Sequence, residues 1–233
     1  MFFKSQNTNK QSGMTFLELV VVMGIFTAIS SAVLFNYRDF SNSVHLQNLS
    51  QEIALQGKRA QTFASQGRRP TLSQVQYTLP LNWVSSYGLA FNKVENNKSF
   101  IFYYNSFPPE ENDEDARALY FSDYSTSNFA FGCGGDVESE CLEEILMTDG
   151  SKIDLICAGS EPHEGNFNCE EGESVEQAHI SFTRPRLESR IMVGGNNLVP
   201  DLVVGNVFIK ISSPDGSQSR FITFWNTGQI SVN

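Results

Sequence analysis

The chain has 233 residues, of which 40% are hydrophobic and 18% are charged, and its formal net charge is −10. This composition is typical of a globular protein and excludes a disordered chain. Because 26 acidic residues outnumber 16 basic ones, the charge balance argues against nucleic acid as a direct ligand, which would favour a basic face.

The N-terminal region combines a basic leader with a long apolar segment. Residues 1–13 carry Lys4 and Lys10 and no acid, and residues 14–37 carry Glu18 as their only charge. As a helix, residues 14–37 would be about 36 Å long, which is enough to cross a hydrocarbon layer of about 30 Å. The preference of basic residues for the cytoplasmic side predicts a single transmembrane segment, with residues 1–13 in the cytoplasm and the later chain outside.

Two simple interpretations explain only part of this pattern. A secretory signal peptide could be cleaved at the small residues Ser30-Ser31-Ala32, but the apolar segment is long for a signal peptide and a carboxylate inside it would be unusual. A plain membrane anchor explains the length but not Glu18, because a charge in the membrane costs several kcal/mol and usually has a partner.

A third interpretation explains both the length and the acid. The region contains, in order, a basic leader, Gly13, the residues Met14-Thr-Phe-Leu-Glu18 and an apolar run. This order resembles the N-terminal motif of type IV prepilins and type II secretion pseudopilins. In that family a membrane peptidase cuts after the glycine and methylates the new N-terminus. The resemblance implies cleavage between Gly13 and Met14, an N-methylated Met14, and an assembly role for Glu18, which would pair with the N-terminal amine of a neighbouring subunit. Opposite charges attract strongly in a low-dielectric medium, and each is costly alone.

Two positions depart from the family's usual pattern. Met14 stands where phenylalanine is commoner, and Phe35 stands where major pilins often carry a helix-kinking proline. The absence of that proline predicts a straighter helix and argues against a major pilin.

Residues 38–67 predict an amphipathic continuation of the same helix. Gly67 and Pro70 provide a stop, so one helix is expected from Met14 to about Gln66. The apolar stripe is short and poor in Leu and Ile, which favours packing on a sheet over a coiled coil. The stripe consists of Leu46, Leu49, Ile53, Ala60 and Ala64.

Residues 71–233 predict a β-rich extracytoplasmic head. Short stretches rich in Phe, Tyr, Val and Ile alternate with Asn, Gly, Pro and Ser clusters. The predicted strands are Val75–Leu79, Tyr87–Phe91, Phe100–Tyr104, Ala118–Phe121, Ile153–Cys157, His179–Phe182, Leu202–Ile211, Phe221–Trp225 and Ile230–Val232. The expected fold is therefore α+β, a long N-terminal α-helix packed on an antiparallel β-sheet head, as the resemblance to pilins also implies.

The C-terminal part carries a narrower resemblance. This part contains, in order, a predicted strand, a polar turn, Arg220, the pattern Phe-Ile-x-Phe, a glycine turn and a predicted closing strand. The order is similar to the C-terminal end of GspH/FimU-type minor pseudopilins. Lys58-Arg59-Ala60 on the helix is similar to a small-and-basic patch of the same group. The resemblance points to a minor pseudopilin of this type.

A variable region is expected at about residues 108–176, which are rich in Asp, Glu and Gly. It contains all four cysteines, whose number and clustering favour disulfides in an oxidising compartment. Three pairings are possible, and the sequence favours the local loops Cys133–Cys141 and Cys157–Cys169 without excluding the other two. Helical pieces are conceivable at Glu110–Ala118 and Glu138–Met147.

The sequence contains no motif for catalysis or a cofactor. It lacks a nucleophile elbow, a phosphate-binding loop and a zinc-protease motif. Zinc on Cys157, His163 and Cys169 has the wrong ligand spacing and would need reduced thiols. Asp113 and Asp115 are weak calcium candidates in an acid run that lacks the spacing of a known calcium loop.

These observations predict a minor pilin or pseudopilin that is not an enzyme and has no cofactor. It would sit in the bacterial cytoplasmic (inner) membrane or in an extracytoplasmic filament. The implied partners are other pilin or pseudopilin subunits, prepilin peptidase and the inner-membrane assembly platform. The alternative is a membrane-anchored, extracytoplasmic ligand-binding protein or enzyme that does not assemble into a filament.

Overall fold

The structure is a computed structural model of the chain. It describes residues 14–70, 85–94, 96–104, 133, 141–159, 169, 174–184, 188–194 and 202–233. The chain divides into two compact units, residues 1–41 and residues 42–233, and helix α1 (Phe16–Ser65) contributes to both. The predicted strands Val75–Leu79 and Ala118–Phe121 and the predicted helical piece Glu110–Ala118 lie outside the described residues.

Helix α1 ends where the glycine and proline signals predict. Gly67 adopts a left-handed φ of 63°, and its N–H donates to the carbonyl of Ala64 at 3.1 Å. The N–H of Arg68 donates to the carbonyl of Phe63 at 3.1 Å. These two bonds form a Schellman motif, in which a glycine without a Cβ accepts the left-handed conformation that closes a helix.

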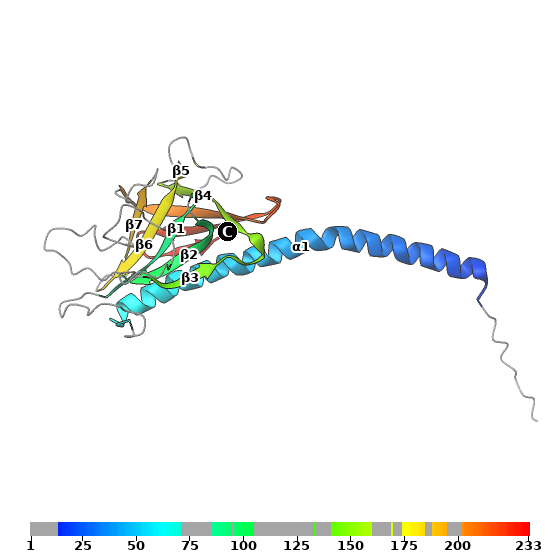
Figure 1. The fold of residues 1–233 in the computed structure, drawn as a ribbon, viewed down its shortest axis with the longest axis horizontal. Coiled ribbons are helices and arrows are strands. Elements are labelled where there is room, and N and C mark those ends of the chain that lie inside the picture. Colours follow the sequence, from blue (N-terminus) through cyan, green and yellow to red (C-terminus); the bar gives the residue numbers. More distant parts are fainter. Residues whose placement is uncertain are drawn as a thin grey trace, which may run out of the picture. The chain divides into compact units, whose positions relative to one another are not determined.

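The rest of the second unit contains two antiparallel sheets among the described residues (Figure 1). The first has the order β3-β2-β1-β6-β7-β8. Its strands are β1 (Ser86–Asn92), β2 (Asn96–Tyr104), β3 (Cys141–Leu146), β6 (Gln177–Thr183), β7 (Ser189–Gly194) and β8 (Leu202–Val204). The second has the order β11-β10-β9-β4-β5. Its strands are β4 (Lys152–Ala158), β5 (Ser174–Val175), β9 (Asn206–Ser212), β10 (Ser219–Trp225) and β11 (Ile230–Val232).

Two of the predicted elements differ from the structure. The helical piece suggested at Glu138–Met147 is wrong over residues 141–146, which form β3 and pair with β2, with Ile145 opposite Phe100. Tertiary pairing therefore overrides the helix propensity of its Glu and Leu residues. The single strand expected at Leu202–Ile211 is divided at Gly205 into β8 and β9, which belong to different sheets.

One hydrophobic core joins the inner faces of both sheets and one face of α1. All five residues of the predicted helical stripe lie in this core. The first sheet contributes alternate residues such as Leu89 and Phe102, and the second contributes Ile209 and Phe224. Because the stripe is buried against strands, residues 42–65 of α1 pack on a sheet, as the short, Leu-poor stripe predicted. Figure 1 shows this part of the helix, in cyan, running beside β3.

Gly57 allows the closest approach between α1 and the second sheet. A Cβ atom at this position would lie 2.6 Å from Cδ1 of Ile230 and 2.9 Å from Cε1 of Phe224. Both distances are shorter than van der Waals contact, so a side chain here would displace the side chains of Ile230 and Phe224 or shift the helix. The glycine that weakens the helix by about 1 kcal/mol relative to alanine is thus explained by packing.

Candidate functional site

The first turn of α1 contains Glu18, the acid that the sequence singled out. Thr15 precedes the helix, and its Oγ1 accepts a hydrogen bond from the N–H of Glu18 at 3.3 Å. The N–H of Thr15 in turn donates to Oε2 of Glu18 at 3.4 Å. This reciprocal pair is a capping box, which satisfies two backbone donors that a helix start otherwise leaves without partners. Gly13, the other predicted processing residue, lies outside the described residues, whereas Met14 is the residue directly before Thr15.

The capping box holds the carboxylate of Glu18 at the very start of the helix. It folds back along the helix toward the backbone of Thr15, one residue from Met14. The helix N-terminus carries a partial positive charge, which favours a carboxylate in this position. The sequence contained a signal for this contact, because Thr15-x-x-Glu18 matches the pattern of a capping box.

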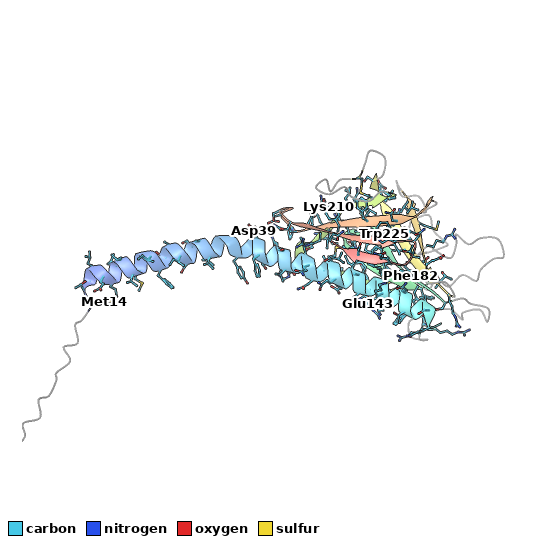
Figure 2. The ribbon with its side chains drawn as sticks, turned by 180° about the vertical axis from the view of Figure 1, so that it is seen from behind. Met14, Asp39, Glu143, Phe182, Lys210 and Trp225 are labelled. Carbon is cyan, nitrogen blue, oxygen red and sulfur yellow. A yellow bond between two sulfur atoms is a disulfide. The ribbon has the colours of Figure 1, made fainter. Side chains whose placement is uncertain are left out.

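Residues 14–34, which include Glu18, expose apolar side chains on every side of the helix. Within the described residues, α1 is the helix that is long and apolar enough to cross a membrane, and its most apolar stretch has no buried residue. Figure 2 shows side chains projecting all round α1 from Met14 onward. The exposed large residues of this segment are Met14, Phe16, Leu17, Leu19, Val20, Val21, Val22, Met23, Ile25, Phe26, Ile29, Val33 and Leu34. Such a surface needs lipid or neighbouring protein to cover it.

The four cysteines form two disulfides. Cys133 is bonded to Cys141, the first residue of β3, and Cys157 in β4 is bonded to Cys169. These pairs are the two local loops that the sequence favours. The Cα atoms of the pairs are 5.4 and 5.5 Å apart, which is within the usual range for disulfides. A disulfide sulfur is not a thiolate, so Cys157 and Cys169 do not combine with His163 into the zinc site considered above.

The structure does not test the other metal candidates. Asp113, Asp115 and His163 lie outside the described residues. Within the residues that the structure describes, no group of three His, Cys, Asp or Glu side chains is placed to hold a metal ion.

Arg59 joins the head-bound part of α1 to the first sheet. Its Nη1 atom lies 2.8 Å from Oε2 of Glu143 on β3, a residue that Figure 2 labels. Its guanidinium carbon lies 4.7 Å from the ring centre of Phe102 and 5.3 Å from that of Phe63. The planar guanidinium therefore stacks on two aromatic rings and pairs with a carboxylate at the same time.

The other residue of the predicted small-and-basic patch has a different contact. Nζ of Lys58 donates to the carbonyl of Gly228 at 3.2 Å, in the turn between β10 and β11. Lys58 and Arg59 thus attach the helix to the second and the first sheet, respectively. These contacts explain both basic residues as parts of the packing between helix and sheets.

Burial shifts the pKa of two side chains of the head, His179 and Tyr87. Burial lowers the pKa of the His179 imidazole, on β6, to about 3. Burial also raises the pKa of Tyr87, on β1, to about 12, although the charge of Arg68 acts in the opposite direction. The hydroxyl of Tyr87 donates to the carbonyl of Arg68 at 2.8 Å, just after the end of α1.

No family model, curated protein or solved structure matches this chain. The functional inference therefore rests on the residues themselves.

Proposed function

We propose that this chain is a minor pilin or pseudopilin of a type IV pilus-like or type II secretion filament. Prepilin peptidase would cut it between Gly13 and Met14 and methylate Met14. The mature subunit would stay in the bacterial inner membrane through residues 14–37 and then assemble through this helix with other subunits, on the inner-membrane platform. The head would lie on the outer side of the membrane.

The observation that carries this proposal is the position of Glu18. It lies five residues after Gly13, at the start of an apolar helix whose side chains are exposed. The capping box gives its carboxylate one backbone N–H as a donor, and no ion pair of Glu18 is seen among the residues that the structure describes. Cleavage after Gly13 would create an amine on Met14 of every subunit. The amine of a neighbouring subunit would supply the missing charge in a low-dielectric environment.

The architecture of the second unit supports the same proposal. The helix that begins with the apolar segment continues into a head, where one stripe of it is buried against antiparallel sheets. One helix thus combines a surface that needs an external partner with a surface that already has one. A subunit that packs its N-terminal helix into a filament and displays its head needs both.

The processing step can be tested with Gly13→Ala in the full-length protein, expressed in cells that contain prepilin peptidase. We expect the variant to keep residues 1–13, whereas the unaltered protein loses them, because the peptidase of this family cuts after glycine. Mass spectrometry of the membrane fraction measures the N-terminus. Gly24→Ala is the matched control, since no atom lies within 4 Å of a Cβ at that position. It should be processed normally.

The alternative function makes the opposite prediction. A bitopic ligand-binding protein or enzyme would keep Lys4 and Lys10 in the unaltered protein as well as in Gly13→Ala. Retention of Lys4 and Lys10 in the unaltered protein, in cells that contain prepilin peptidase, would therefore favour the alternative and reject the pilin proposal.

A further inference from the structure

Two turns of the head hold the helix at Asn42 and His45, within the turn that precedes its first core residue, Leu46. Nδ1 of His45 lies 2.9 Å from Oδ2 of Asp149, in the 3₁₀ turn Thr148–Gly150 between β3 and β4. Nδ2 of Asn42 donates to Oδ2 of Asp215, in the turn between β9 and β10, at 3.1 Å. The helix is thus bonded to both sheets just before Leu46 enters the core.

The backbone of each turn positions its acid. Asp149 has φ 60° and ψ 20°, a left-handed conformation that costs a residue other than glycine about 1 kcal/mol and is tolerated best by Asp and Asn. Oδ1 of Asp215 accepts from the hydroxyls of Ser213 and Ser217 and from the N–H of Ser217. Its Oδ2 atom is directed to Asn42. Hydrogen bonds from Ser213 and Ser217 lower the pKa of the Asp215 carboxyl, which keeps it ionised.

The two turns also contact one another. A Cβ at Gly150 would lie 3.2 Å from Cγ of Pro214, so the turns meet beside the helix. Gly150 itself has φ 74°, so the turn that presents Asp149 contains two consecutive left-handed residues. A strained conformation persists only where its surroundings hold it, and such strain often marks a functional segment.

We propose that Asn42, His45, Asp149 and Asp215 form a polar latch. The latch holds residues 42–49 of α1 on the head, and its release frees this segment before any other part of the head-bound helix. The device makes the first attachment of the head-bound helix adjustable, so that this segment can detach without unfolding of the rest of the head. It does not depend on the proposed function.

The contrast with the later attachments of the helix carries this inference. The side chains of His45 and Asp149 are 46% and 52% exposed, and water and salt weaken such a pair. Farther along, Ile53 and Ala60 are fully buried, and Gly57 packs directly against Phe224. Local opening is easiest where buried apolar contacts are few and polar bonds are exposed. Residues 42–45 of α1 meet this condition, because the buried apolar contacts of the helix begin only at Leu46.

The latch can be tested by the rate at which an introduced thiol is alkylated in the full-length protein in detergent. Leu46→Cys places the thiol at a buried position directly after His45 of the latch, and Ala60→Cys places it at a buried position remote from the latch. Cys133, Cys141, Cys157 and Cys169 are in disulfides, so the introduced thiol is the one that reacts.

We expect His45→Ala and Asp149→Asn each to raise the alkylation rate at Leu46→Cys about threefold to fivefold. This corresponds to the loss of an exposed pair that contributes up to about 1 kcal/mol. Asp149→Asn keeps a residue that tolerates the left-handed backbone, so it removes the charge without altering the turn. His45→Asn should restore slow alkylation, because its Nδ2 atom is a donor at the same distance from the backbone as Nδ1 of histidine. The rate at Ala60→Cys should stay constant throughout.

Two results would overturn the latch. One is an unchanged rate at Leu46→Cys in both His45→Ala and Asp149→Asn. The other is an equal increase at Ala60→Cys, which would indicate a general loss of stability. Glu52→Gln, which removes an exposed acid on the same helix, is the matched control and should leave both rates unchanged.

Discussion

Residues 16–34 and residues 46–64 belong to the same helix, yet they meet their surroundings in opposite ways. The first segment is apolar on all sides, and its large side chains are exposed. The second is polar on most sides and buries one stripe, which includes Ile53 and Ala64, in the core of the head. The more apolar segment is therefore the one that the chain's own fold leaves uncovered.

The spacing of apolar residues along α1, and not their number, therefore determines which part of the helix is buried in the core of the head. A stripe at steps of three and four provides one face that fits a sheet. An apolar surface all round a helix has no side left for water, so it needs lipid or other helices on every side. Residues 16–34 are suited to a membrane and to an assembly, and residues 46–64 are suited to a single head.

The largest effect is expected when one buried and one exposed side chain of the second segment are each shortened to alanine. We expect Ile53→Ala to reduce the free energy of unfolding of the head by about 2–5 kcal/mol, because Ile53 is fully buried in the core. Leu55→Ala should change it by less than about 0.5 kcal/mol, since Leu55 is 67% exposed on the same helix. Denaturant titration followed by tryptophan fluorescence measures both. Equal effects would contradict the assignment of the buried face.

Acid should destabilise the head while leaving the first segment helical. His179 has a pKa of about 3 in the folded head and about 6.5 when unfolded, so the unfolded state binds more protons between these values. The stability that the neutral ring provides is complete above pH 6.5 and falls by about 1.4 kcal/mol per pH unit below it, until about pH 3. Unfolding measured between pH 7 and pH 5 should show this slope.

His179→Gln should flatten that dependence on pH, because glutamine does not titrate. An equal slope in the variant and the unaltered protein would assign the acid sensitivity to other groups. Circular dichroism at pH 5 should retain the helical signal of residues 16–34 in detergent, since this segment does not depend on the core of the head.

A smaller effect is expected from the polar attachment of the second segment. Arg59→Lys keeps the charge beside Glu143 but loses the flat group that stacks on Phe102. We expect the free energy of unfolding to fall by about 0.5–1 kcal/mol, the usual size of a cation–π contact at a partly exposed site. Arg69→Lys, an exposed arginine past the end of α1, should have no effect. A loss no larger than that of Arg69→Lys would show that the stacking contributes nothing.

The sequence was most informative where one local rule sufficed. The helical stripe, the stop at Gly67 and the strands β10 and β11 follow from spacing, from a left-handed glycine and from turn residues within a few positions. The preferred disulfide loops also follow from short separations. In each case the determining residues are close together in the chain.

Features that depend on distant residues could not be predicted. The strand β3 forms because β2 provides a partner, and Gly57 is explained only by Phe224 and Ile230. The pair between His45 and Asp149 joins residues that are far apart in the chain. Thr15 is a different case, because its capping-box pattern was visible in the sequence.

The central claim is that the mature subunit begins at Met14 and that neighbouring subunits cover the exposed apolar side chains of residues 14–34. The most direct test is the N-terminal peptide of the unaltered protein, from membranes of cells with and without prepilin peptidase. The account predicts an N-methylated peptide that starts at Met14 in the first case and a peptide that retains Lys4 and Lys10 in the second. Retention of Lys4 and Lys10 in both cases would contradict it.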